Sequence, residues 1–347
     1  MRRGRKEKWR RSCCNRSDFG GAASVVQRLL TWRSGSPNLP VSAIVWHDEQ
    51  YLLMPAKIVN SNPVLAAPKH SRLQGQTAES LDDYYSGRKF FGDDFSLEEI
   101  REWYGMEENA CYEVYDQGHK RMPNNDCLHW QCGYRWALAD KHSLGKVLGL
   151  GSGNGEEFRP VRRWMEHLYI VESAEGYFRD NANTTYAKAR VEGDLDFPAE
   201  FFDTAVNIAV LHHIPNVTHV LSELFRVLKP GGFCLVKEPI TTLGPWHCPR
   251  KSGLCPCERG FPRDLLDAMS RRAGFEIVKK TYFEFPPLRH LRDDAGVDTY
   301  NSKFWTGLDR LCCRLMDWNY RYHRVNWFQK LAPSYVFLVL RKPADRL

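Results

Sequence analysis

The sequence predicts an α/β fold in which helices cover both faces of a doubly wound, mostly parallel sheet. Between residues 146 and 283, short apolar runs alternate with amphipathic stretches, a pattern typical of strand–helix–strand units. The first apolar run leads into a glycine-rich turn, "GLGSGNGEEF". The chain ends on a further apolar run, "SYVFLVLRK", which predicts a last buried strand.

The predicted elements follow in order along this region. Strands are expected over residues 146–150, 169–172, 204–209, 232–237 and 275–283, and helices over residues 156–167, 177–187, 217–228 and 263–273. Before them, a capping box from Ser96 to Glu99 begins a helix. A second, aromatic helix is expected in "DCLHWQCGYRWALADKH", where Cys127 and Cys132 are predicted to be core thiols. After the alternating region, residues 301–331 predict a long aromatic helix.

These elements divide the chain into four predicted parts. Residues 1–85 form a basic, poorly ordered extension with short strands near residues 43–46 and 51–54, because Gly, Ser, Pro and Asn interrupt every apolar run. The other parts are a helical cap region, an α/β core, and a C-terminal aromatic helix with the last strand, over residues 86–142, 143–290 and 291–347.

The net charge of +7 comes from one segment. Residues 1–36 hold ten Lys and Arg against Glu7 and Asp18, and the remainder has 39 basic and 40 acidic residues. The near-zero net charge of residues 37–347 argues against a nucleic-acid groove. The basic run is expected to be a solvated end, and the alternative is a tail that touches RNA or anionic lipid.

Targeting and redox signals are weak in this sequence. No apolar run approaches the ~20 residues that a membrane span needs, and no apolar segment follows the basic run as in a secretory signal. The eleven cysteines show no disulfide-framework spacing. The sequence therefore predicts reduced thiols and a cytoplasmic protein.

The glycine loop has a spacing that selects among nucleotide ligands. Gly151, Gly153 and Gly155 give G-x-G-x-G rather than the dinucleotide fingerprint G-x-G-x-x-G, and no Lys-Ser/Thr pair follows as in a phosphate-binding loop. Two acids, Glu156 and Glu157, come next. They disfavour a pyrophosphate and suit a ligand with a positive centre.

With four further segments, the loop resembles the class I S-adenosylmethionine-dependent methyltransferases. These segments are "ESAEGYF", "EGDLDFP", "FFDTAVNIAVLHHIPN" and "LSELFRVLKPGGFCLVKEP". The resemblance implies a Rossmann-like fold and S-adenosyl-L-methionine as cofactor. It places the ribose hydroxyls on Glu172 beside Ser173, and the adenine on Asp194 with the Leu195 backbone next to the ring. The remaining cofactor-binding residues that it implies are Gly149, Gly151, Ser152, Gly153, Gly155, Asn207 and Ala209.

One position departs from the family pattern. Gly149 stands where the family usually has Asp or Glu to hold the methionine end of the cofactor. Its presence implies weaker binding, replacement by a neighbour such as Glu156, or a non-catalytic binding module. Several shorter stretches, "LGSGNGEEFRP" and "SYVFLVLRKP" among them, are similar to a poorly characterised bacterial group within the class.

The candidate catalytic residues end two neighbouring strands. His212 and His213 follow the strand at 204–209, and Glu238 follows the strand at 232–237. The carboxyl edge of such a sheet is where ligands bind, so one of the three is expected to act as a base on a hydroxyl acceptor. Each has a structural alternative, namely a helix-start contact for the histidines and a salt bridge for Glu238.

The loop after residue 239 is the predicted acceptor site. Trp246, Arg250 and Arg259 are the candidate substrate residues, since guanidinium groups grip carboxylates, phosphates and sugars. The same loop contains soft ligands at His247, Cys248, Cys255 and Cys257. Their spacing differs from that of usual zinc sites, so no metal is expected.

Taken together, the sequence predicts methyl transfer to a small-molecule or glycan acceptor at a hydroxyl, by in-line displacement. The alternatives are an RNA or protein methyltransferase that uses the basic tail, and a non-catalytic module on the same fold. Exposed aromatic residues in the predicted C-terminal helix are compatible with a homodimer.

Overall fold

The structure is a computed structural model that describes residues 70–74, 76, 80–116, 125–244, 246, 254 and 258–344. All of them belong to the second of two units of the chain, residues 49–347. The short strands predicted near residues 43–46 and 51–54 lie outside the described residues.

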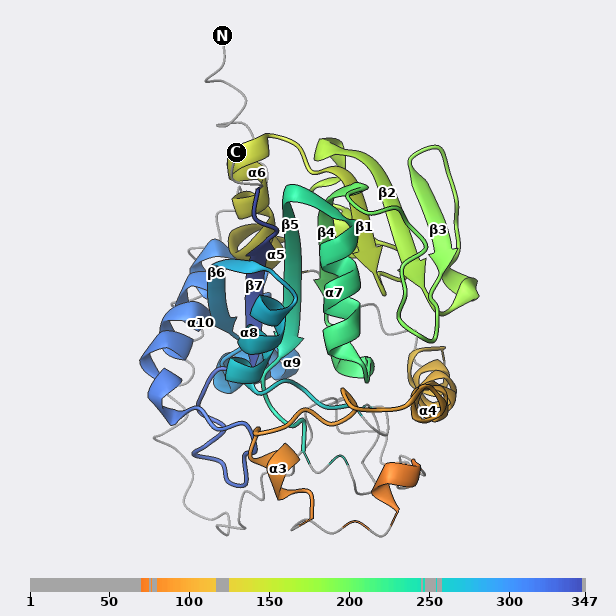
Figure 1. Ribbon diagram of the computed structural model, residues 1–347. Helices are drawn as coiled ribbons and strands as arrows, with labels where there is room; N and C mark the ends of the chain where they lie inside the picture. The colour runs from red at the N-terminus through yellow and green to blue at the C-terminus, as the bar shows by residue number, and fades with distance from the viewer. Residues whose placement is uncertain are drawn as a thin grey trace, which may run out of the picture. The chain divides into compact units, whose positions relative to one another are not determined.

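The predicted doubly wound sheet is present, with seven strands in the order β3-β2-β1-β4-β5-β7-β6 (Figure 1). The strands are β1 (Gly145–Leu150), β2 (Met165–Glu172), β3 (Thr184–Lys188), β4 (Phe202–Ile208), β5 (Leu228–Pro239), β6 (Glu276–Phe283) and β7 (Tyr335–Arg341). Strands β3, β2, β1, β4 and β5 pair in parallel, and β7 is antiparallel to both β5 and β6. The predicted last strand is confirmed, and its continuous apolar run is explained by burial between two neighbours and two faces.

Two layers of helices cover the sheet. On one face, α7 (Val217–Val227) and α8 (Arg263–Arg272) pack against apolar residues of β1, β4, β5 and β7. On the other, α5 (Asp126–His129), a π-helical turn (Trp130–Tyr134) and α6 (Arg135–Lys141) do the same. The predicted aromatic helix is therefore confirmed with a π-turn inside it, and Cys127 and Cys132 are buried thiols as expected.

The first predicted crossover helix, residues 156–167, is absent. The chain forms only two 3₁₀ turns, Glu156–Phe158 and Arg162–Trp164, and then enters β2. Pro160 lies in the middle of the predicted helix. Proline there removes a helical hydrogen bond, and its ring clashes with the carbonyl four residues earlier, which explains the difference.

The second predicted helix, residues 177–187, is also wrong. A 3₁₀ turn, Glu175–Tyr177, is followed by an irregular segment and then by β3. The side chain of Asn181 accepts a hydrogen bond from the backbone N–H of Asn183 at 2.9 Å, and such asparagine turns compete with helix formation. The β-branched pair Thr184–Thr185 then favours a strand.

The long C-terminal helix is shorter than predicted. An unpredicted helix α9 (Pro286–Ala295) precedes α10 (Lys303–Leu315), which ends well before residue 331. Beyond a 3₁₀ turn, Asp317–Asn319, the buried amide of Asn319 donates to the carbonyls of Phe328 and Leu331 at 2.7 and 3.1 Å. These bonds fold the segment back on itself as a loop.

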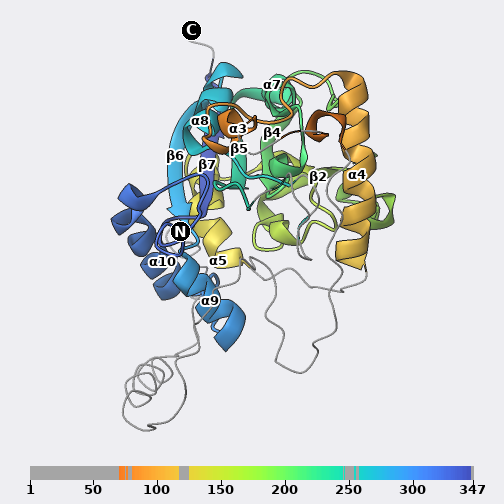
Figure 2. The same ribbon diagram turned by 90° about the horizontal axis from the view of Figure 1, so that it is seen from below.

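A cap lies at the carboxyl ends of the parallel strands, below the sheet in Figure 1 and facing the viewer in Figure 2. It contains a 3₁₀ turn (Ser71–Leu73), α3 (Asp82–Tyr85) and α4 (Leu97–Asp116). The predicted capping box is confirmed, since the Ser96 N–H donates to Glu99 at 2.7 Å and the Glu99 N–H donates to the Ser96 hydroxyl at 3.3 Å. The core of the cap is an aromatic cluster of Leu73, Leu81, Tyr85, Phe91, Trp103 and Trp246, which we call the cap cluster.

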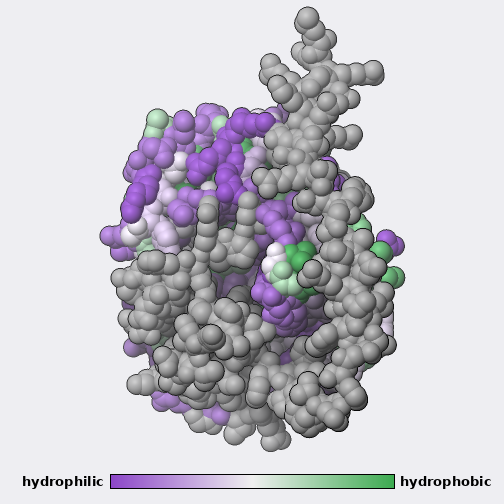
Figure 3. All heavy atoms as spheres, turned by 180° about the vertical axis from the view of Figure 1, so that it is seen from behind, coloured by the Kyte–Doolittle hydropathy of each residue, from purple (hydrophilic) through white to green (hydrophobic). Residues whose placement is uncertain are grey.

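The surface is mostly hydrophilic where the described residues are visible from behind, with small apolar patches (Figure 3). Of the ten large hydrophobic side chains that are exposed in the described part, seven lie between residues 304 and 328. The aromatic C-terminal stretch is therefore partly surface rather than core. Within the described ranges, no helix combines the length and the apolar character that a membrane crossing requires.

The π-turn gives a direct test of the packing on one face of the sheet. A Cβ on Gly133 would lie 2.5 Å from the ring of Phe337, whereas a Cβ on Gly105 in α4 would meet nothing within 4 Å. We expect Gly133→Ala to lower the free energy of unfolding by about 1–3 kcal/mol through overpacking. Gly105→Ala, the matched control, should leave it unchanged or raise it by up to about 1 kcal/mol. Urea unfolding measures both, and equal effects would contradict this packing.

Candidate functional site

The glycine loop leaves the carboxyl end of β1 in a conformation that requires glycine. Gly151, Gly153 and Gly155 have φ values of 60°, 49° and 70°, a region that glycine adopts without steric cost. The Gly151 N–H donates to the Val171 carbonyl at 2.8 Å. The phenol of Tyr186 donates to the Gly153 carbonyl at 3.1 Å. The loop is thus fixed to β2 and β3 with its glycines in place.

Gly149 is explained by the packing around it. A Cβ at this position would lie 2.6 Å from the Ser152 hydroxyl oxygen and 2.9 Å from the ring of Phe158. There is no room for the Asp or Glu that the family pattern would place here. Of the two acids after the loop, Glu156 is exposed and faces Arg159 at 3.7 Å. Glu157 is half-buried, and removal from water raises the pKa of its carboxyl to about 7.

Glu172 ends β2 with its carboxylate directed at the loop. One oxygen accepts from the Gly153 N–H at 2.9 Å, and the other accepts from the N–H groups of Ser173 and Ala174 at 2.9 and 3.3 Å. The Ser173 hydroxyl donates to the same oxygen at 3.3 Å. The nearly buried carboxylate of Glu172, which the resemblance assigns to the ribose, is therefore held between the glycine loop and the turn after β2.

The expected adenine residues surround a small cavity. It has a volume of about 40 Å³ and is lined by apolar side chains of β1 and β2 together with Asp194, Leu195 and Tyr104 of α4. His219 lies 2.7 Å from the Asp194 carboxylate. The Leu195 N–H donates to Glu223 at 2.9 Å, so its backbone is already bonded and its side chain is the part that lines the cavity.

A buried polar side chain beside the loop is Asn207. Both of its side-chain amide atoms have no hydrogen-bond partner among the described residues. Asn207 lies on β4 opposite Leu150 of β1. Buried polar groups are nearly always bonded, so these atoms fit a polar ligand on the glycine loop. Ala209, just beyond, has a φ of 59° and marks strained backbone at the same edge.

The three candidate catalytic residues are close together. His212 Nδ1 lies 2.7 Å from the Glu238 carboxylate. The other Glu238 oxygen accepts from the N–H groups of Val210 and Leu211 at 3.0 and 2.8 Å. The rings of His213 and His212 are tilted by 39° to each other, with centroids 4.2 Å apart. Strands β4 and β5 thus bring both histidines and Glu238 to one place.

Two further acids complete this group, and sequence reasoning missed their role. Glu258 lies 3.2 Å from His212 Nε2, and Glu107 of α4 lies 3.2 Å from His213 Nδ1. We call His212, His213, Glu107, Glu238 and Glu258 the histidine cluster. A signal for Glu107 exists in the sequence, because an acid four residues after Trp103 falls on the buried face of the helix. Glu258 has no comparable local signal.

The protonation of His212 follows from its neighbours. Burial alone would lower the pKa of its imidazole, but the facing carboxylates of Glu238 and Glu258 outweigh burial and raise that pKa to about 9. His212 is therefore a cation at neutral pH in the protein alone. With both ring nitrogens facing carboxylates, it is poorly placed to accept a proton.

The predicted acceptor residues lie elsewhere than expected. Arg259 is buried, and its guanidinium donates to the carbonyls of Phe91, His212 and Ile214 at 2.8–3.0 Å. This geometry gives Arg259 a structural role in place of the predicted grip on the acceptor. Trp246 is buried in the cap cluster, stacked on Tyr85 at 5.0 Å, and Arg250 lies outside the described residues.

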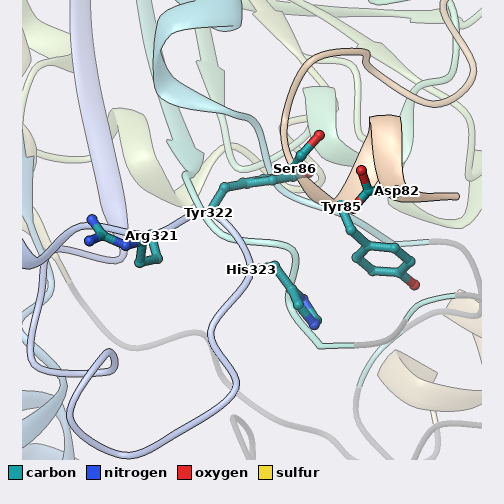
Figure 4. Close-up of a pocket in the computed structure, with 6 residues that line it drawn as sticks. All are labelled: Asp82, Tyr85, Ser86, Arg321, Tyr322 and His323. Atoms are coloured by element: carbon teal, nitrogen blue, oxygen red, sulfur yellow. The ribbon is translucent and has the colours of Figure 1, made fainter. Parts of the chain in front are cut away.

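A larger cavity, of about 300 Å³, lies on the cap (Figure 4). It is lined by Asp82, Tyr85, Ser86, Arg321, Tyr322 and His323. Figure 4 shows Arg321 pointing away from the others, and the rings of Tyr85 and His323 lie 4.8 Å apart. No predicted site residue lines this cavity.

The fold and the site together define a class I S-adenosylmethionine-dependent methyltransferase domain. Its strand order, its glycine loop and the acid that ends β2 all fit this class, and the cofactor of the class is S-adenosylmethionine. Residues 148–236 match the family model described as a methyltransferase domain. This match covers the glycine loop, β2, β3, β4 and most of β5.

Known proteins share this part of the chain. It is similar to 24-methylenesterol C-methyltransferase 2 of Oryza sativa subsp. japonica, with 33% identity over 41% of this chain and 44% of the relative. It is also similar to a sterol 24-C-methyltransferase of Candida albicans, with 34% identity over 30% of this chain and 31% of the relative. The chain therefore spans less than half of the length of these relatives. A plant and a yeast as sources do not support the narrower resemblance to a bacterial group.

Two solved structures are similar at low identity. A didemethyltoxoflavin N1-methyltransferase of Burkholderia thailandensis, bound to its substrate and S-adenosylhomocysteine, has a TM-score of 0.45 and 14% identity, with 70% of this chain and 90% of that chain covered. An S-adenosylmethionine-dependent methyltransferase of Mesorhizobium loti has a TM-score of 0.40 and 14% identity, with 60% of this chain and 97% of that chain covered.

The packing at Gly149 predicts the outcome of restoring the usual acid. Gly149→Asp should lower the free energy of unfolding by about 1–3 kcal/mol, because its Cβ overlaps Ser152 and Phe158. It should also not increase the affinity for S-adenosylmethionine. Gly176→Asp is the matched control, since a Cβ there meets nothing within 4 Å. Unfolding and calorimetric titration measure both variants, and tighter cofactor binding by Gly149→Asp would contradict the packing argument.

Proposed function

We propose that the protein transfers a methyl group from S-adenosylmethionine to a small-molecule acceptor, at a hydroxyl. The observation that supports this most directly is the junction of the glycine loop with the histidine cluster. Val210 packs so closely on Gly151 that a Cβ there would lie 2.5 Å from it. The N–H of the same Val210 donates to Glu238. One residue therefore joins the proposed cofactor loop to the proposed catalytic group.

Several residues of the site fit the cofactor. Glu172 offers a carboxylate to the ribose hydroxyls, and such charge-assisted bonds are strong. The buried Asn207 amide, which has no partner among the described residues, supplies further polar contacts beside the loop. When bound, S-adenosylmethionine supplies an electrophilic methyl group that forms a bond to the acceptor oxygen as its bond to sulfur breaks, leaving S-adenosylhomocysteine.

The roles of the three candidate catalytic residues differ. Glu238 is fully buried and already accepts two backbone N–H groups and His212, so we assign it a positioning role. His212 is protonated and enclosed by carboxylates. His213 is the more open of the two histidines, with 22% of its side chain exposed against 5% for His212. We place the acceptor hydroxyl against the side formed by His213 and Glu258, where the cluster stabilises the oxygen while the hydroxyl proton passes to water.

A small molecule is the favoured acceptor class. Two relatives bear the names of sterol methyltransferases, and the near-zero net charge of residues 37–347 argues against RNA as the acceptor. Because those names refer to methylation at carbon, a carbon acceptor is the second candidate. The carbon-13 shift of the transferred methyl separates an ether from a carbon-bound product.

Cofactor binding is the first test. We expect Glu172→Ala to weaken S-adenosylmethionine binding by about 100-fold, since charge-assisted hydrogen bonds contribute about 1.5–3 kcal/mol each. Glu175→Ala is the matched control, because Glu175 is three residues away, exposed, and paired with Lys188 at 2.6 Å. Calorimetric titration measures both variants. Equal binding by the wild type and Glu172→Ala would refute the proposed placement of the ribose.

Turnover is the second test. A panel of sterols, phenols and sugars is incubated with S-adenosylmethionine, and S-adenosylhomocysteine release is followed. On the best acceptor, His213→Gln should lower kcat by about 100-fold, the usual size of an acid–base contribution, and leave cofactor affinity unchanged. His290→Gln, a partly exposed histidine on α9, is the control. A loss of cofactor affinity in His213→Gln would instead indicate a structural role for His213.

A further inference from the structure

The histidine cluster contains three metal-ligating side chains that converge. One donor atom from each of His212, His213 and Glu258 lies within 4.8 Å of the other two. His212 Nε2 and the nearest Glu258 oxygen are 3.2 Å apart. Donors about 2.1 Å from a common cation lie about 3–3.5 Å from each other. The His212–Glu258 pair already has this spacing, and the donor atom of His213 lies within 4.8 Å of both partners.

The second ring nitrogen of each histidine faces a carboxylate. His212 Nδ1 lies 2.7 Å from Glu238, and His213 Nδ1 lies 3.2 Å from Glu107. Each contact fixes a ring so that its Nε2 is the atom left for a ligand. Metal-binding histidines almost always have such a carboxylate or carbonyl behind them. The two supporting carboxylates come from separate elements, Glu238 from β5 and Glu107 from α4. Two adjacent histidines held in this way are more than a helix-start contact requires.

The charges of the cluster also fit a cation. Three buried carboxylates, from Glu107, Glu238 and Glu258, face the two imidazoles. Buried carboxylates are stabilised by a positive partner. A divalent cation between these side chains supplies two positive charges.

We propose that His212, His213 and Glu258 bind one divalent first-row transition cation, such as zinc or manganese, at the carboxyl ends of β4 and β5. Two imidazoles and one carboxylate suit these metals better than magnesium or calcium. Glu238 and Glu107 orient the two histidines from behind.

The consequence for catalysis rests on the proposed methyl transfer. The open side of the cluster, at His213, leaves a coordination position for the acceptor oxygen. A cation there lowers the pKa of a bound hydroxyl, whose proton passes to water before the oxygen receives the methyl group. The acceptor class then narrows to molecules that present a hydroxyl to a metal, such as a phenol or a vicinal diol.

Direct titration of the metal tests the site without any need for turnover. The full chain, freed of metal with a chelator, is titrated calorimetrically with zinc chloride and manganese chloride. We expect one equivalent to bind. Glu258→Gln and His213→Gln should each weaken binding by at least about 100-fold, and Glu238→Gln by about 10–100-fold, the usual effect of losing a carboxylate behind a ligand. His167→Gln, on β2 and bonded to Thr185, is the matched control and should bind as the wild type does.

Two results would overturn the proposal. One is the absence of stoichiometric binding to the wild type, which would leave a proton as the only cation of the cluster. The other is binding that survives in Glu258→Gln and is lost when Cys248, Cys255 and Cys257 are all replaced by serine, which would place the metal on the loop. S-adenosylmethionine is titrated into the same samples, so failure to bind the cofactor and failure to bind the metal are seen separately.

Discussion

The carboxylate of Glu238 is the constraint on which the site depends. It is fully buried at the end of β5, yet it serves the end of β4, where it accepts two consecutive backbone N–H groups and His212 Nδ1. A buried polar group needs hydrogen-bond partners, and Glu238 finds its partners in the turn after β4. These bonds fix that turn, and with it the directions of both histidines and the packing of Val210 on the glycine loop.

Arg259 connects the turn after β4 to the cap. Its guanidinium joins three carbonyls, two from the turn after β4 and one from Phe91 in the cap. It also lies 4.2 Å from the ring centroid of Phe90 and 4.5 Å from that of Trp103. A planar group with five donors suits such a position better than lysine. The residue before it is Glu258, so the position of the guanidinium also determines where that carboxylate meets His212.

The parts of the fold that could be predicted are those with a local signal. Apolar runs identified β1, β4 and β7, and the capping box identified the start of α4. The prediction of a helix at residues 156–167 was wrong because it followed the strand–helix alternation expected of the fold and gave too little weight to Pro160. The helix predicted at residues 177–187 failed because the asparagine turn at Asn181 was not recognised.

For the contacts of the site, the sequence predicted one of the two residues and not its partner. His212, His213 and Glu238 were found because strand ends place residues at a known edge of the sheet. Their partners Glu107 and Glu258 were not, since the pair between His213 and Glu107 spans 106 positions in the sequence. A long-range pair of this kind depends on how the cap sits on the core, which no periodicity describes. For the same reason the sequence placed Arg259 in the acceptor site, although its donors are used inside the protein.

Gly149 shows how a departure from a family pattern can be a consequence of packing rather than a lesion. With Ser152 and Phe158 filling the place of a side chain, the loop keeps its glycine conformation without the usual acid. The negative charge near the loop then comes from elsewhere. Glu172 lies at one side of the loop. The half-buried Glu157, whose pKa burial raises to about 7, lies close enough for the charge of Glu172 to raise that pKa further. A positively charged ligand in this place would favour the ionised form of Glu157. The same ligand would also offset the repulsion between the two carboxylates. The acid missing from β1 is therefore compensated by acids on the elements that follow it, and the positive centre that the glycine loop suggests retains its counter-charge.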